Sequence, residues 1–244
     1  MQIIGIIPAR YASSRFPGKP LVDIHGKVMI QHVYEQCLKS KYLSKIIIAT
    51  DDQRIYDAVI NFGGEVYLTS TEHLNGTSRC AEVVQQLTTI PEFVINIQGD
   101  EPLIHPNQID LLIELFINDK QLDIATLIKK EYNIQLLHNQ NIVKAISKND
   151  GYISDFKRVI NTNLNFFYKH IGIYGFKTKV LQEIVKLPPS ERELVQHLEQ
   201  LRWLDNGYTI KGAITQEESI SVDTPEDLKK VQEIIYRNKA NVPL

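Results

Sequence analysis

The chain has 244 residues, of which 43% are hydrophobic, and its formal net charge is -2. This length and composition predict a globular protein that buries a sizeable core, as one large domain or as a domain with a subdomain. The nearly neutral charge excludes a general attraction to nucleic acid or to a membrane surface, and no apolar stretch approaches the length of a membrane span. We expect a cytoplasmic protein because no signal-peptide pattern occurs, and core thiols at Cys37 and Cys80 because they lack metal-ligand spacing.

The first half of the chain alternates between two kinds of segment. Short apolar runs rich in β-branched residues predict buried strands, and apolar residues three or four positions apart predict helices. In chain order these are a strand at 3–7, a helix at about 30–39, a strand at 45–49, a helix after residue 52, a strand at 66–68, a helix from about residue 78, a strand at 93–97, a helix at 108–116 and a strand at 124–128. This alternation favours a parallel sheet with helices on both faces.

From about residue 130 the pattern changes. Residues 142–147 and 151–156 predict a hairpin, and a strand follows at 168–176 with no helix between them. A helix at about 191–206 and a strand at 209–214 come next.

A well-marked helix start follows near the end of the chain. Thr224 is the predicted N-cap, Pro225 the first helical residue and Asp227 the third. The expected fold class is α/β, a doubly wound and mostly parallel sheet with a smaller mixed or antiparallel subdomain. We expect a single domain over residues 1–244, with a section at about 130–215 inserted into it.

The segment after the first strand combines positive charge with small residues. Arg10, Arg15 and Lys19 supply three cations within ten residues, while Ser13 and Gly18 let the backbone approach a ligand closely. A polyphosphate needs peptide N–H groups and fixed positive charge, so this loop is a candidate phosphate site, although a solvated basic loop has the same composition. It is not a Walker loop, because the Gly-x-x-x-x-Gly-Lys spacing is absent.

Two acids are candidates for holding a cation beside that phosphate. Asp100 follows the strand at 93–97, and in a doubly wound sheet the carboxyl end of this strand faces the same crevice as the first loop, as would Gln98. A carboxylate repels a polyphosphate unless a cation intervenes, and Mg²⁺ typically takes one or two carboxylates with phosphate oxygens and waters. Asp223 is the candidate second carboxylate. Each acid also fits a structural role, Asp100 in a turn and Asp223 at a helix start.

Two polar clusters have a functional and a structural interpretation. Thr77 and Arg79 fit a ribose or base edge at a helix N-terminus, or an ordinary capped helix start. His170 and Tyr174 share one face of an extended strand, and the missing side chain at Gly172 leaves space between their rings. That space suits a sugar, and a tightly packed strand has the same pattern.

The predicted helix at 191–206 carries polar residues inside an apolar pattern. Its period leaves Glu199 and Gln200 to face away from the core, where we expect them to be exposed. The residues that the period places in the core are Leu194, Leu198, Leu201, Trp203 and Leu204.

Taken in order, these motifs resemble the 3-deoxy-manno-octulosonate cytidylyltransferase (CMP-KDO synthetase) family over nearly the whole chain. The first loop and the Gln-Gly-Asp-Glu-Pro motif at 98–102 are typical of the wider sugar cytidylyltransferases. The His-x-Gly-x-Tyr motif at 170–174 and the Leu-Glu-Gln-Leu-Arg motif at 198–202 narrow the resemblance to this branch.

The resemblance implies transfer of CMP from CTP to the anomeric hydroxyl of 3-deoxy-manno-octulosonate (KDO), with release of pyrophosphate, for lipopolysaccharide synthesis. It also implies a homodimer that uses Mg²⁺. The catalytic residues that it implies are Arg10, Lys19, Asp100 and Asp223, with Mg²⁺ on the two aspartates. The residues that it implies bind the triphosphate and nucleoside are Arg10, Ser13, Arg15, Lys19, Thr77 and Arg79. Those that it implies bind the sugar acid are Gln98, Arg158, His170, Tyr174, Glu199 and Gln200.

Two departures from the family pattern keep alternatives open. Asn75 stands where the family has Ser, and residues 156–161 lack the proline of the family's Phe-Ser-Arg-x-x-Ile-Pro stretch. A related acid, such as 8-amino-KDO or a sialate, is therefore an alternative substrate. A glycosyltransferase-like protein is a further class, but Asp100 is not part of an Asp-x-Asp motif. A non-catalytic nucleotide-binding domain would need no second metal ligand at Asp223.

Overall fold

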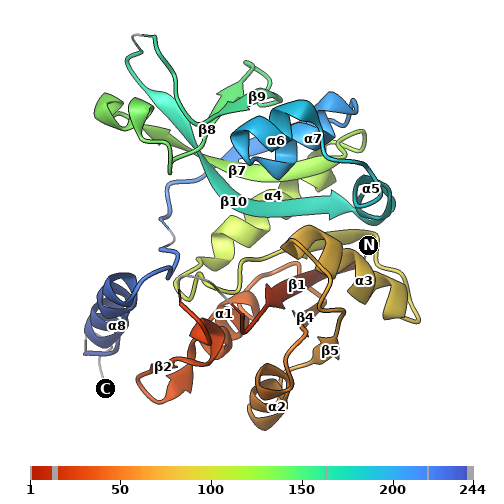
Figure 1. Cartoon of the computed structure of the whole chain (residues 1–244), viewed down its shortest axis with the longest axis vertical. Helices are drawn as coiled ribbons and strands as arrows, with labels where there is room; N and C mark the ends of the chain where they lie inside the picture. The colour runs from red at the N-terminus through yellow and green to blue at the C-terminus, as the bar shows by residue number, and fades with distance from the viewer. Residues whose placement is uncertain (1, 13–15, 163, 219, 241–244) are drawn as a thin grey trace. The chain divides into compact units, whose positions relative to one another are not determined.

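The computed structural model describes residues 2–12, 16–162, 164–218 and 220–240. The chain divides into two compact units, which are coloured by chain position in Figure 1. Unit 1 comprises Met1–Pro91, Asn96–Asn107 and Glu218–Leu244, and unit 2 comprises Glu92–Ile95 and Gln108–Glu217.

Unit 1 is built on parallel strands with helices between them, as the alternating pattern predicts. Strands β1 (Ile3–Ala9), β4 (Lys45–Thr50) and β5 (Val66–Leu68) lie side by side in that order. Their isoleucines are buried because the strands are covered on both faces. The helices are α1 (Met29–Cys37), α2 (Gln53–Asn61), α3 (Gly76–Gln86) and α8 (Pro225–Ala240). Short elements η1 (Lys19–Leu21), β2 (Asp23–Ile24) and β3 (Lys27–Val28) follow the first loop.

The end of the chain packs against its beginning within unit 1. Val231 and Ile235 of α8 share a buried cluster with Ile24 and Met29, and Figure 1 shows α8 beside the β2 region. The predicted cap of α8 is confirmed, because the Thr224 hydroxyl accepts a hydrogen bond from the Asp227 N–H at 3.2 Å while the Asp227 carboxylate accepts one from the Thr224 N–H at 3.1 Å. Both cysteines are buried free thiols, as expected.

Unit 2 carries the mixed and antiparallel section. Strand β7 (Ile124–Glu131) pairs in parallel with β11 (Ile210–Ile214) and antiparallel with β10 (Phe167–Lys177). The predicted hairpin is confirmed as β8 (Lys144–Ser147) and β9 (Ile153–Lys157), and β8 also pairs with β10. The remaining elements are α4 (Pro106–Asn118), η2 (Ile134–His138), α5 (Thr178–Ile184), α6 (Glu191–Gln196) and α7 (Glu199–Asp205). The last residue of β6 (Phe93–Asn96) and the first two residues of α4 belong to unit 1.

The prediction of a single helix at 191–206 is wrong, because two helices occupy this segment. His197 adopts a left-handed conformation (φ 52°, ψ 50°) that ends α6, and α7 begins two residues later. This break changes the direction of the apolar face, so Leu194 is 61% exposed instead of buried, and Gln200 is 5% exposed instead of facing solvent. Arg202 of α7 ties the pair together through the Glu193 carboxylate at 2.5 and 2.6 Å.

No helix among the described residues has both the length and the apolar character that crossing a bilayer requires.

Candidate active site

A polar pocket in unit 1 gathers the predicted phosphate and metal residues. Its volume is about 240 Å³. Its walls come from the ends of β1 and β6, the first loop, the start of α3 and the segment before α8. The lining residues are Pro8, Ala9, Arg10, Lys19, Pro20, His73, Leu74, Asn75, Gly76, Arg79, Gln98, Gly99, Asp100 and Asp223. Ser13 and Arg15, the other two predicted residues of the first loop, lie outside the described residues.

Lys19 joins the two predicted metal-binding acids. Its ammonium donates to Asp100 Oδ2 at 2.6 Å, to Asp223 Oδ1 at 3.1 Å and to the Val222 carbonyl at 3.1 Å. The Val222 N–H donates in turn to the Asp100 carbonyl at 2.9 Å, which holds the two acidic segments side by side. Two carboxylates from distant parts of the chain therefore converge on one cation.

This arrangement fits a divalent cation of the Mg²⁺ type. The two carboxylates already share the Lys19 ammonium, and Mg²⁺ binds through one or two carboxylates while phosphate and water oxygens complete its octahedron. No cluster of three metal-ligating acids, histidines or cysteines occurs in the described part of the chain, so a cation at this position would depend on oxygens from a bound phosphate.

Gly99 lets the acidic turn approach the first strand. A Cβ atom at this position would lie 2.7 Å from the Pro8 carbonyl oxygen, closer than carbon and oxygen atoms can pack. The Ile97 N–H donates to the Ile6 carbonyl at 2.9 Å just before this turn. The glycine between Gln98 and Asp100 therefore brings both side chains to the pocket wall.

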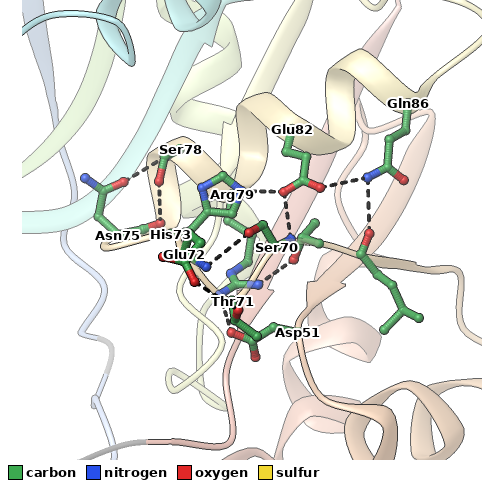
Figure 2. Close-up of polar contacts among 12 residues, drawn as sticks. Asp51, Ser70, Thr71, Glu72, His73, Asn75, Ser78, Arg79, Glu82 and Gln86 are labelled. Atoms are coloured by element: carbon green, nitrogen blue, oxygen red, sulfur yellow. Dashed lines mark hydrogen bonds and ion pairs between the residues drawn. The ribbon is translucent and has the colours of Figure 1, made fainter.

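The start of α3 forms part of the pocket wall. Asn75 caps the helix, because its side chain accepts from the Ser78 N–H at 2.8 Å, and the Ser78 hydroxyl donates back to the Asn75 carbonyl at 3.1 Å (Figure 2). The residue that departs from the family pattern thus supplies an ordinary helix cap. Thr77 is buried in this first turn, with 2% of its surface exposed.

The Arg79 side chain is buried and is held by hydrogen bonds to other side chains of unit 1. Only 3% of the residue is exposed, and its guanidinium donates to Asp51 Oδ2 at 2.7 Å and to the Thr69 hydroxyl. Arg79 lines the pocket, but its fixed partners are protein groups. The prediction for Arg79 had not identified Asp51 as its partner, because the two residues lie 28 positions apart and only the fold brings them together.

Glu82 was also missed, although it organises the loop before α3. Its carboxylate accepts from the Ser70 N–H at 2.9 Å, contacts His73 Nε2 and accepts from Gln86 at 3.2 Å (Figure 2). Burial raises the pKa of Glu82, but the Ser70 and His73 contacts outweigh that effect and leave the pKa below its usual value. A signal was present, since Arg79, Glu82 and Gln86 share one helix face.

The predicted sugar-binding residues other than Gln98 lie in unit 2. The His170 and Tyr174 ring centroids are 5.4 Å apart, because the pairing register of β10 shifts between Ile171 and Tyr174. The regular strand expected here, with a gap between the rings, is therefore replaced by a bulge that brings the rings together. Burial and the nearby Glu199 raise the pKa of Tyr174 well above its usual value.

Arg158 lies against backbone in unit 2. Its guanidinium donates to the carbonyls of Gln196 at 2.6 Å, Gln140 at 2.9 Å and His197 at 3.0 Å. These bonds fix the segment where α6 ends.

Comparisons with known proteins give the same family from sequence and from structure. Residues 4–219 match the family model described as Cytidylyltransferase. The 3-deoxy-manno-octulosonate cytidylyltransferases of Parabacteroides distasonis and Fusobacterium nucleatum are each 46% identical to this chain; the alignments cover 94% and 99% of this chain and 96% and 100% of the relatives. A solved structure of CMP:2-keto-3-deoxy-manno-octonic acid synthetase complexed with CTP superposes with a TM-score of 0.93 at 36% identity, covering 98% of this chain and 100% of that one.

The family match over most of the chain, together with near-full-length relatives, means that this chain belongs to the cytidylyltransferase family, among the 3-deoxy-manno-octulosonate cytidylyltransferases.

Proposed function

We propose that this protein transfers CMP from CTP to the anomeric hydroxyl of KDO and releases pyrophosphate, the activation step that lipopolysaccharide synthesis requires. The observation that carries the proposal is the convergence of Arg10, Lys19, Asp100 and Asp223 on one pocket. Cations for a triphosphate and carboxylates for a divalent ion are the two halves of a nucleotidyl-transfer site. The names of the near-full-length relatives supply the substrate pair.

The reaction needs positioning and charge more than a protein nucleophile. The KDO hydroxyl oxygen bonds to the α-phosphorus in line and gives up its proton to solvent, while the bond to pyrophosphate breaks and pyrophosphate leaves with its developing negative charge. Arg10 and Lys19 bind the phosphate oxygens and stabilise that charge. Asp100 and Asp223 hold Mg²⁺, which, when bound, neutralises phosphate charge and lowers the pKa of the attacking hydroxyl.

Lys19 has a different partner at each stage of this scheme. Before substrate binds, its ammonium neutralises Asp100 and Asp223. When CTP enters with its cation, the ammonium exchanges the carboxylates for phosphate oxygens. The two acids thus have a cation between them at each stage, either the ammonium or the divalent ion.

The nucleoside and sugar assignments are part of the same proposal. Thr77 and Arg79 lie beside the nucleoside, with Ser13 and Arg15 at the triphosphate. Gln98, Arg158, His170, Tyr174, Glu199 and Gln200 bind or position the sugar acid. We further propose a homodimer, as the family resemblance implies, and a cytoplasmic location, because CTP is a nucleotide of the cell interior.

The test is pyrophosphate release from the purified protein with Mg²⁺, CTP and KDO. UTP replaces CTP in one set of reactions, and N-acetylneuraminate or 8-amino-KDO replaces KDO in another. We expect release with CTP and KDO. Pyrophosphate release only with another acid would show that this acid, and not KDO, is the substrate. No release with any pair of substrates would overturn the proposal.

A matched pair of variants tests the site itself. Asp100→Asn removes a carboxylate charge from the pocket, whereas Asp57→Asn removes one from the exposed face of α2, where Asp57 bonds Gln53. We expect D100N to lose turnover and D57N to retain it. Full Mg²⁺-dependent turnover in D100N would contradict the role given to Asp100.

A further inference from the structure

Thr126 contacts His170 through a hydroxyl whose single hydrogen is already committed. Thr126 lies on β7 and is fully buried. Its Oγ1 lies 2.9 Å from the Ile173 carbonyl oxygen, 3.3 Å from the Ile171 carbonyl oxygen and 3.0 Å from His170 Nε2. The two carbonyl oxygens accept hydrogen bonds and cannot donate them, so the hydroxyl hydrogen points toward Ile173.

The contact with His170 must then run in the opposite direction. Because the Thr126 oxygen has only lone pairs left to offer, His170 Nε2 carries the hydrogen and donates it. Among the described residues none hydrogen-bonds the other ring nitrogen, Nδ1. The register shift of β10 between Ile171 and Tyr174 is what points both carbonyls and the imidazole at the same hydroxyl.

The surroundings keep the imidazole neutral. The Phe156 ring packs edge-on at a centroid distance of 5.0 Å, and the Tyr174 ring lies at 5.4 Å. Burial lowers the pKa of His170 to about 3, so the ring carries a single hydrogen at physiological pH. A neutral ring with its hydrogen on Nε2 presents a bare lone pair at Nδ1.

We propose that Thr126 is a positioning residue that holds His170 in the Nε2–H tautomer, so that Nδ1 accepts a hydrogen bond from a hydroxyl of the sugar acid. This role rests on the proposed function, in which His170 binds the acid. It makes the position selective for a hydrogen-bond donor, because a substrate that presents only an acceptor or an apolar group there leaves the Nδ1 lone pair unpaired.

The tautomer is measured directly by NMR on the full-length protein labelled with ¹⁵N at histidine. The His170 signals are identified by their loss in a His170→Gln variant. We expect a protonated Nε2 and an unprotonated Nδ1 at neutral pH. A protonated Nδ1 would overturn the inference whatever the enzyme's substrate is.

Two substitutions at Thr126 then test its role in binding. Thr126→Val keeps the shape but has no hydroxyl, whereas Thr126→Ser restores the hydroxyl and serves as the conservative rescue. We expect T126V to change the tautomer signals and to raise the KM for KDO about tenfold, the effect of one lost hydrogen-bonded orientation, with the KM for CTP unchanged. T126S should return both properties toward those of the wild type.

The outcomes separate this inference from the proposed function. If wild-type protein releases pyrophosphate with CTP and KDO but T126V keeps the wild-type tautomer and KM for KDO, the role of Thr126 is refuted. If wild-type protein turns over no acid, the proposed function fails, while the spectrum still decides the tautomer. Circular dichroism identifies a variant that has lost its fold, and the wild-type spectrum needs no variant.

Discussion

Replacing Lys19 with methionine should have opposite effects on catalysis and on metal binding. In Lys19→Met most of the side-chain length is retained, but Asp100 and Asp223 lose the ammonium at 2.6 and 3.1 Å. The carboxylates then lose the positive charge of Lys19, so a divalent cation no longer competes with this ammonium. We expect tighter binding of Mn²⁺ in the absence of nucleotide, together with a large loss of turnover.

The expected increase in Mn²⁺ affinity can be worked out from the exposed fractions of the Lys19, Asp100 and Asp223 side chains. Lys19 is 13% exposed, and the two carboxylates are 25% and 30% exposed, so solvent screens the pairs in part. Hydrogen bonds to charged groups contribute about 1.5–3 kcal/mol, and partial screening reduces this to about 1–2 kcal/mol. The corresponding change in Mn²⁺ affinity is about tenfold, while losing a phosphate ligand should lower kcat/KM about 100-fold or more.

Titration of Mn²⁺, with the free ion followed by electron paramagnetic resonance, measures the first effect, and pyrophosphate release measures the second. Lys27→Met is the matched control, because Lys27 pairs with Glu35 in the same unit at 2.7 Å and does not line the pocket. Unchanged or weaker Mn²⁺ binding in K19M would refute the argument that this ammonium occupies the place of the metal.

Three further predictions concern other parts of the molecule. Glu82→Gln weakens the hold on the loop before α3, so the KM for CTP should rise several-fold in initial-rate measurements with little change in the KM for KDO; equal effects on both would contradict this. Gly99→Ala pushes a methyl group against the Pro8 carbonyl and should lower the free energy of unfolding by about 1–3 kcal/mol in urea. Gly172→Ala should cost less than 1 kcal/mol, because its new methyl meets none of the described residues within 4 Å apart from the two chain neighbours. The pKa of His170 is lowered from 6.5 to about 3, so between these pH values the unfolded chain binds a proton there and the folded chain does not. The free energy of unfolding should therefore be highest above pH 6.5 and should fall as the pH drops toward 3. His170→Phe should flatten this pH dependence of the free energy of unfolding, measured in urea between pH 7 and 4.

Strands and loop motifs were predictable because their causes are local. The isoleucine run before Pro8 is buried wherever it lies in a parallel sheet, and the Thr224-Pro225 cap needs only its neighbours in sequence. The meeting of Asp100 with the first loop followed from a general rule, that parallel strands present their carboxyl ends at one edge. These elements are confirmed with boundaries within a few residues.

Features that depend on distant partners were not predictable. Nothing local to Arg79 points to Asp51, and nothing near Lys19 points to its carbonyl partner at Val222. The break at His197 also has a distant contact, because Arg158, 39 positions earlier in the chain, donates a hydrogen bond to the His197 carbonyl. A helical period cannot detect such a contact, which is why Leu194 was placed in the core.

The pairing of Lys19 with Asp223 means that the pocket can be completed only late in the synthesis of the chain. The two residues are 204 positions apart, and at about 5–20 residues per second the ribosome adds Asp223 roughly 10–40 s after Lys19. Asp100 is added 81 residues after Lys19, and from then until the end of the interval the growing chain carries the basic loop and Asp100 but not the second carboxylate. Under the proposed mechanism, a translation product that ends before Asp223 lacks the second metal ligand and should not consume CTP.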